Sequence, residues 1–138
     1  KTIWSKSLPI VPRFISASRS EEIYLILYNL GIGETLSAVY RLNNQGEIIA
    51  HQFVNAIFYA PALISQDKIA LLGYTKEMPS MLFFDKGLNL LRTIDLSKVP
   101  PPIVQPAVLT DCTIILATSN GPYIVRIDEN PIIKLLPW

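Results

Sequence analysis

The sequence predicts an all-β protein, and three observations support that prediction. Eleven prolines in 138 residues disfavour long uninterrupted helices. The apolar runs have strand length and are separated by turns rich in Gly, Asn, Asp and Pro. The sequence also repeats: "PALISQDKIALLGY" begins at Pro61, and "PAVLTDCTIILATS" begins 45 residues later at Pro106. We therefore expect four-stranded antiparallel sheets that recur along a single domain, residues 1–138.

Each repeat contains four expected strands, the first of which begins at the proline. The later strands are expected at 69–74, 80–85 and 90–96 in one repeat and at 114–119, 123–128 and 132–138 in the next. A more divergent copy follows Pro12, with strands expected at 23–29, 37–42 and 47–53. The approximate repeats are 10–53, 58–96 and 103–138, and residues 1–9 resemble the end of a preceding repeat.

Four strands at this period are typical of a β-propeller, in which small sheets called blades pack face to face. Blades are covered on both faces, which fits near-continuous apolar runs such as "YLILY" (24–28) and "SMLFF" (80–84). The alternative is a β-sandwich, which gives no reason for a threefold repeat. Three blades do not close a ring, since known propellers need about four to eight. We expect a partial ring, completed by self-association or by the remaining blades of a longer chain.

Composition excludes several classes of function. The net charge is +1 and the twelve Lys and Arg residues are scattered, so no nucleic-acid surface is predicted. No apolar run reaches the roughly 18 residues of a membrane span. Cys112 is the only cysteine, and no metal-ligand spacing or phosphate-binding Gly loop occurs, so neither metal nor cofactor is predicted. A start at Lys1 without an initiator Met favours a processed or excised domain and an extracytoplasmic location.

The expected turn between third and fourth strands resembles the Asp-box of sialidase-like propellers, Ser-x-Asp-x-Gly-x-Thr-Trp. In "FFDKGLNLL" (83–91) Asp85 and Gly87 match its Asp and Gly, whereas its Ser, Thr and Trp are replaced. The first repeat keeps Gly46 and the third keeps Asp128. The acidic or amide side chain is expected to bind turn amides, and Gly to take the positive-φ position. Pyrroloquinoline-quinone-type propeller repeats are the second resemblance, through "SNGPYIVRID" (119–128).

These resemblances imply two enzymatic alternatives, a fragment of a sialidase-like glycoside hydrolase and, third, a quinoprotein dehydrogenase. A sialidase-type site needs three arginines, a Tyr–Glu nucleophile and an Asp acid/base. We expect Arg41, Arg92 and Arg126 to be solvated cations at strand edges. His51 is expected to be solvated on an outer strand, and Glu22 to lie on ordinary polar surface. No catalytic residue is predicted, and the sequence leans away from an enzyme.

A propeller gathers two kinds of loop on one face: those entering the inner strand and those joining the second strand to the third. The predicted ligand-binding residues come from these loops: Arg13, Tyr28, Glu34, Tyr59, Tyr74, Lys76, Gln105 and Asn120. Tyrosines, amides and a few charges are typical of surfaces that bind proteins or carbohydrates. The sequence therefore favours a non-catalytic binding or scaffolding module whose ligand is a protein or a carbohydrate.

Overall fold

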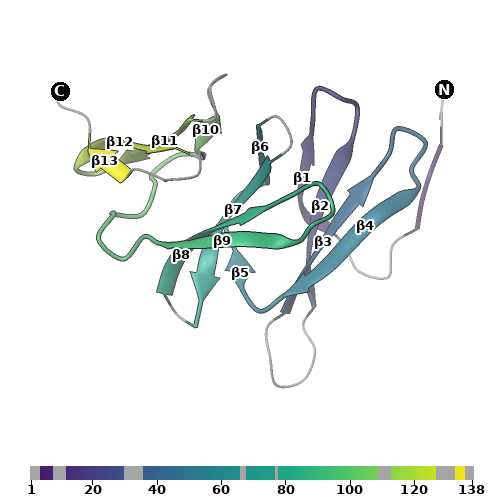
Figure 1. Cartoon of the computed structure of the whole chain (residues 1–138), viewed down its shortest axis with the longest axis horizontal. Coiled ribbons are helices and arrows are strands. Elements are labelled where there is room, and N and C mark those ends of the chain that lie inside the picture. Colours follow the sequence, from purple (N-terminus) through teal and green to yellow (C-terminus); the bar gives the residue numbers. More distant parts are fainter. Residues whose placement is uncertain are drawn as a thin grey trace.

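A computed structural model describes residues 4–7, 12–29, 36–65, 68–76, 78–108, 113–126 and 133–135. The described chain forms three antiparallel sheets, one after another along the sequence (Figure 1). Within this part of the chain no helix has the length and apolar character needed to cross a bilayer. The prediction of an all-β, antiparallel protein is confirmed.

The strands of each sheet follow one another in space as they do in sequence. The N-terminal sheet has the order β1 (Pro12–Ala17), β2 (Ile23–Asn29), β3 (Leu36–Leu42) and β4 (Ile48–Val54). The middle sheet holds β5 (Ile57–Phe58), β6 (Leu63–Ser65), β7 (Lys68–Thr75), β8 (Met78–Phe84) and β9 (Leu90–Asp95). The C-terminal sheet has the order β10 (Ala107–Val108), β11 (Thr113–Thr118), β12 (Gly121–Arg126) and β13 (Ile133–Leu135).

Two short strands share one edge of the middle sheet. β5 pairs with the end of β7 at Gly73 and Tyr74, whereas β6 pairs with the beginning of β7. Together β5 and β6 occupy the place of one interrupted strand, so each sheet has four strand positions. Gly73 permits the close approach of β5, because a Cβ there would collide with the carbonyl oxygen of Ile57.

The middle sheet is covered on both faces. Alternate side chains of β7 and β8 point to opposite sides. On one side Ile69, Leu71, Leu82 and Phe84 pack with Tyr24, Ile26 and Val39 of the N-terminal sheet. On the other side Ala70, Leu72, Met81 and Phe83 pack with Ile114, Leu116 and Val125 of the C-terminal sheet. These eight middle-sheet residues are at most 4% exposed, which explains the continuous apolar runs in their strands.

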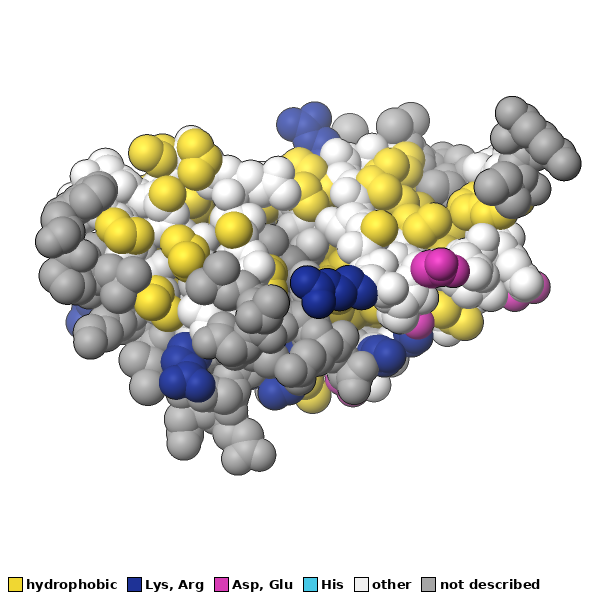
Figure 2. Space-filling model, turned by 90° about the horizontal axis from the view of Figure 1, so that it is seen from above, with side chains coloured by type: hydrophobic (Ala, Val, Ile, Leu, Met, Phe, Trp, Pro, Cys, Tyr) yellow, Lys and Arg dark blue, Asp and Glu magenta, His cyan; other side chains and the backbone are white. Residues whose placement is uncertain are grey.

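The outer strands β4 and β9 are mostly exposed and carry Ile48, Ile49, Phe53, Leu90 and Leu91 on the surface. Figure 2 shows hydrophobic side chains in separate groups, with lysine and arginine side chains dispersed among them on that face. Apart from β5, which was not expected, the described strands begin within about two residues of their expected positions, as for β8 at Met78–Phe84 against 80–85. The described residues show no closed ring, so the propeller and the repeat boundaries stay predictions.

Candidate functional site

A pocket of about 310 Å³ lies where the middle and C-terminal sheets meet, and we call it the seam pocket. This volume is at the lower end of the range for small-ligand sites. Its lining is mostly apolar and comes from β7, β8, β11, the residue that follows β5 and the segment that connects the two sheets. The described lining residues are Tyr59, Tyr74, Pro79, Leu96, Ser97, Lys98, Val99, Pro100, Pro101, Pro102 and Leu116.

Two tyrosines form one wall of the seam pocket. Tyr74 lies at the end of β7, and Tyr59 directly follows β5, which pairs with that end of β7. The Tyr59 backbone N–H donates to the Leu72 carbonyl at 3.1 Å, which fixes its position. The ring centroids are 5.5 Å apart and the rings are tilted by 53°. The pairing of β5 with β7 therefore brings together two aromatic rings that are 15 residues apart in the sequence.

The Tyr59 hydroxyl is held in its neutral form. Burial, and secondly the neighbouring Tyr74, raise the pKa of Tyr59 to about 12. Among the described residues, no hydrogen bond involves this hydroxyl, and it is not sealed away from solvent. At neutral pH the pocket thus contains a phenol that is able to donate a hydrogen bond to a ligand and does not act as a base.

A second wall is the segment Leu96–Pro102, which we call the proline wall and which is connected to both sheets. At its start the Leu96 N–H donates to the Pro79 carbonyl at 2.8 Å, and the Val99 N–H donates back to Leu96 at 2.9 Å. At its end Pro102 bridges to Thr118 at the end of β11. Since prolines also restrict the backbone, this wall is rigid.

The seam pocket carries little net charge. Its described polar lining consists of Ser97 and Lys98 together with the tyrosine hydroxyls. The pKa of Asp95, next to the pocket, is lowered mainly by hydrogen bonding to Ser97, whose N–H lies 2.8 Å from Oδ1. Lys98 lowers that pKa further, so Asp95 offsets part of the lysine charge.

The structure brings two of the eight predicted site residues together, Tyr59 and Tyr74. Arg13 is exposed on β1, where its guanidinium carbon lies 6.0 Å from the ring centroid of adjacent Phe14. Three further predicted residues are exposed in loops and do not line the seam pocket: Lys76, Gln105 and Asn120. The Tyr28 side chain and Glu34 lie outside the described residues. A role of any of these residues in ligand binding stays a prediction.

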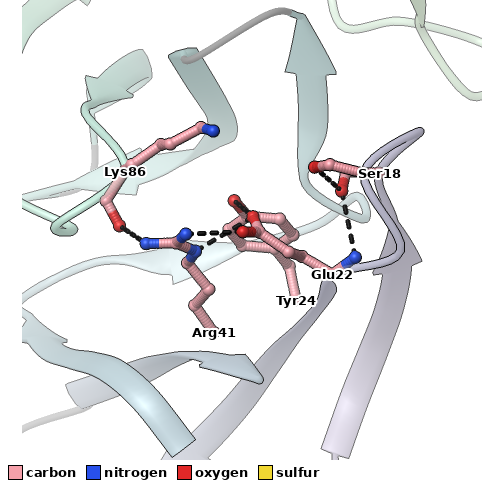
Figure 3. A network of polar contacts seen from close by, with 6 residues as sticks. Ser18, Glu22, Tyr24, Arg41 and Lys86 are labelled. Atoms are coloured by element: carbon pink, nitrogen blue, oxygen red, sulfur yellow. Dashed lines mark hydrogen bonds and ion pairs between the residues drawn. The ribbon is translucent and has the colours of Figure 1, made fainter. Parts of the chain in front are cut away.

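A second polar cluster joins the N-terminal and middle sheets (Figure 3). Arg41 on β3 forms a two-pronged ion pair with Glu22, with Nε–Oε2 at 3.0 Å and Nη2–Oε1 at 2.5 Å. Its Nη1 donates to the Lys86 carbonyl in the β8–β9 turn at 2.7 Å, and the Tyr24 hydroxyl donates to Glu22 Oε2 at 3.0 Å. We call these four residues the arginine clamp.

The arginine clamp corrects two expectations. The Arg41 and Glu22 side chains are only 16% and 15% exposed, so Arg41 is not a solvated cation and Glu22 is not ordinary surface. Hydrogen bonds from Arg41 are the main cause that lowers the pKa of Glu22, although burial acts in the opposite direction. Arg92 and Arg126 are exposed, as expected. Arg41 is thus committed to a contact between sheets.

The turn that resembles an Asp-box also differs from expectation. The Asn89 N–H donates to Asp85 Oδ1 at 2.9 Å, so Asp85 does bind a turn amide. The positive φ of 61° belongs to Leu88, however, and not to Gly87. A Cβ at Gly87 would lie 2.9 Å from Asn89 Nδ2, so the absence of a side chain at Gly87 leaves room for the Asn89 side chain.

The same turn occurs between β3 and β4. Asn43 Oδ1 accepts from the Gln45 and Glu47 N–H groups at 3.0 Å, and Gly46 has a φ of 81°. Gly46 therefore corresponds to Leu88 of the second turn and not to Gly87, with which the sequence comparison aligned it. Both turns are held by local hydrogen bonds, and Asp128 of the third repeat lies outside the described residues.

The remaining candidate residues form no catalytic grouping in the described chain. His51 is exposed on β4, as expected, and stacks on Tyr40 with centroids 5.7 Å apart. The described residues contain no group of three or more His, Cys, Asp or Glu side chains able to hold a metal ion. Cys112 lies outside the described residues.

Sequence reasoning missed the proline wall of the seam pocket. Residues 97–102 fall between the expected repeats 58–96 and 103–138 and were given no role, yet the segment 96–102 supplies seven of the lining residues. The available signal was the run Pro100–Pro101–Pro102, which predicts a rigid segment but not its place beside the aromatic pair. Neither a protein-family model, nor a curated protein, nor a solved structure matches this chain.

Proposed function

We propose that this chain is a non-catalytic binding module built from three propeller-type blades, and that the seam pocket receives a protein or carbohydrate ligand. The observation that carries the proposal is the tilted pair of Tyr59 and Tyr74 in a preformed pocket. Tyrosines are enriched at binding surfaces because one side chain offers both an apolar ring and a hydrogen-bonding hydroxyl.

The arrangement of the sheets supports propeller-type blades. Each sheet has four antiparallel strand positions in chain order, and consecutive sheets pack face to face. The inner-edge strands β6 and β10 of neighbouring sheets lie side by side, as strands around a propeller axis do. Self-association, or further blades of a longer chain, would complete the ring. A solution mass near twice 15.5 kDa would support self-association, and a well-folded monomer would refute it.

Two features favour binding over catalysis. A nucleophilic tyrosine needs a lowered pKa, whereas the pKa of Tyr59 is raised to about 12. A sialidase-type site needs free arginines that converge on a carboxylate, whereas Arg41 is engaged with Glu22 and Lys86. The glycoside hydrolase alternative would have to draw its arginines from elsewhere.

The proposal is tested by screening the wild-type chain against a glycan array and a peptide library. Each ligand found is then measured with Tyr74→Ala and with Phe53→Ala as the matched control. Tyr74 is 39% exposed in the seam pocket and Phe53 is 55% exposed on β4, so both changes remove an exposed aromatic ring. We expect Tyr74→Ala alone to lose binding. The proposal is wrong if every ligand binds Tyr74→Ala as tightly as wild type.

A further inference from the structure

We propose that the occupant of the seam pocket is a proline-bearing peptide segment in the polyproline II conformation. This inference rests on the proposed function and narrows its ligand to one chemical class. It follows from three properties of the seam pocket: the geometry of the rings, the supply of hydrogen-bond donors and the scarcity of groups that match a sugar.

The two rings are tilted and do not stack face to face. Their centroids are 5.5 Å apart, their planes make an angle of 53°, and both rings line the seam pocket. Pro79 pairs with Tyr74 across the β7–β8 hairpin, and Pro100–Pro102 face the same space. Aromatic grooves of this kind accept pyrrolidine rings, which are flat, apolar and already rigid in a polyproline II segment.

The hydrogen-bonding groups of such a peptide match those of the pocket. A polyproline II segment has no internal hydrogen bonds, so its carbonyl oxygens are free acceptors, and its prolines have no N–H to satisfy. The Tyr59 hydroxyl is a neutral donor with no hydrogen bond in the described chain. Pro100, Pro101 and Pro102 of the proline wall likewise present no N–H, so an incoming proline that packs on them leaves no backbone donor of these three residues unpaired.

A carbohydrate is matched less well by the same pocket. Each buried sugar hydroxyl needs a partner, and carboxylate and amide side chains are the ones that bind two hydroxyls at once. Among the described lining residues there is no Asp, Glu, Asn or Gln. Ser97, Lys98 and two phenols are too few to satisfy the hydroxyls of a sugar ring.

The pocket is also preformed on the side that the peptide would contact. The proline wall is hydrogen-bonded to Pro79 at one end and bridged to Thr118 at the other. The backbone of Tyr59 is held by Leu72. Since both partners are rigid before they meet, little conformational entropy is lost on binding, which favours a short peptide ligand.

The test is an NMR titration of the isotope-labelled 138-residue chain with three probes. These are a proline decamer, a glycine–serine decamer as the matched flexible control, and a chito-oligosaccharide as the sugar probe. We expect the proline decamer alone to shift amide signals of the seam pocket in a saturable way. Tyr59→Phe, which keeps the ring, should weaken this binding about three- to tenfold, and Tyr74→Ala should weaken it at least about tenfold.

Tyr40→Phe is the control for Tyr59→Phe, because Tyr40 stacks on His51 outside the seam pocket and should leave affinity unchanged. Circular dichroism checks that each variant is folded. Equal binding of both decamers, no binding of the proline decamer, or insensitivity to Tyr74→Ala would overturn the inference. If the sugar binds in its place and depends on Tyr74, the proposed function survives and the peptide inference fails. If neither class of ligand depends on Tyr74, both fail.

Discussion

Replacing Arg41 by Met should destabilise the fold by removing the arginine clamp. The change keeps a long unbranched side chain but deletes three hydrogen bonds, two to Glu22 and one to the Lys86 carbonyl. Glu22 is then left largely buried with Tyr24 as its remaining partner in the clamp. The variant therefore leaves a carboxylate without its main counter-charge at the join between the N-terminal and middle sheets.

The size of the effect follows from the burial of the pair. Removing one partner of a fully buried ion pair costs about 3–5 kcal/mol. The two side chains are 16% and 15% exposed, so water relieves part of that cost. We expect the free energy of unfolding to fall by about 2–4 kcal/mol. Arg92→Met, on exposed β9, is the matched control and should change it by no more than about 0.5 kcal/mol.

Urea denaturation followed by circular dichroism measures these changes, and a double-mutant cycle isolates the pair. Glu22→Gln alone strands the arginine charge, whereas Glu22→Gln with Arg41→Met removes both charges. The double variant should therefore be less destabilised than the sum of the single variants, with a coupling energy of at least about 1 kcal/mol. Additive effects, or an Arg41→Met variant as stable as Arg92→Met, would refute the clamp.

The arginine clamp also predicts a pH dependence. The pKa of Glu22 is lowered in the folded protein, chiefly by Arg41, from an ordinary value of 4.5. A group with a lowered pKa contributes stability above its unfolded pKa and loses it as the pH falls through the folded pKa. The wild-type chain should lose stability below about pH 4.5 more steeply than Arg41→Met, because the variant lacks the interaction that lowers this pKa.

Three further predictions concern single positions. The pKa of Tyr59 is raised from 10.0 to about 12, so ultraviolet absorbance should show one tyrosine that ionises at a higher pH than an ordinary tyrosine. The free energy of unfolding should fall between pH 10 and 12 in the wild type, because the unfolded chain loses this proton first. The fall should be smaller in Tyr59→Phe. Gly73→Ala should destabilise by about 1–3 kcal/mol in urea, since its Cβ meets the Ile57 carbonyl. Gly46→Ala should lower the free energy of unfolding by about 1–2 kcal/mol, because a φ of 81° disfavours any side chain. It should also red-shift the fluorescence of Trp4, because the new Cβ would lie 2.6 Å from the Trp4 ring and displace it. A wild-type result at any of these positions would contradict the contact described there.

The strands could be predicted from the sequence because buried strands consist of consecutive apolar residues. β7 and β8 are covered on both faces, so their apolar residues run without interruption and mark the strand directly. Gly and Asn marked the β3–β4 turn for a similarly local reason, since Gly46 takes a left-handed conformation. The prediction failed at Leu88, where a fully buried leucine adopts that conformation at a φ of 61°. Tertiary burial overrides local preference there, and no local pattern reports it.

The candidate site was predicted in part. The propeller pattern assigns Tyr59 and Tyr74 to loops on one face; in the structure Tyr74 lies at the end of β7, and the two rings do lie together. The proline wall was missed because its position depends on how closely two sheets approach. Arg41 was misjudged for the same reason: its partner carbonyl, Lys86, is 45 residues away and belongs to another sheet.

The two joins between sheets contain different features beside their apolar cores, the arginine clamp at one and the proline wall at the other. A change in the first should therefore alter stability without altering binding at the second. Beside its apolar core, the join of the N-terminal and middle sheets contains the arginine clamp, which reaches the turn after β8. The join of the middle and C-terminal sheets is closed by the proline wall, which contacts Pro79 near the start of β8. β8 has seven residues, so the two features are about 20 Å apart along it. At that distance their energies should add, and Arg41→Met should lower stability while the seam pocket keeps its affinity.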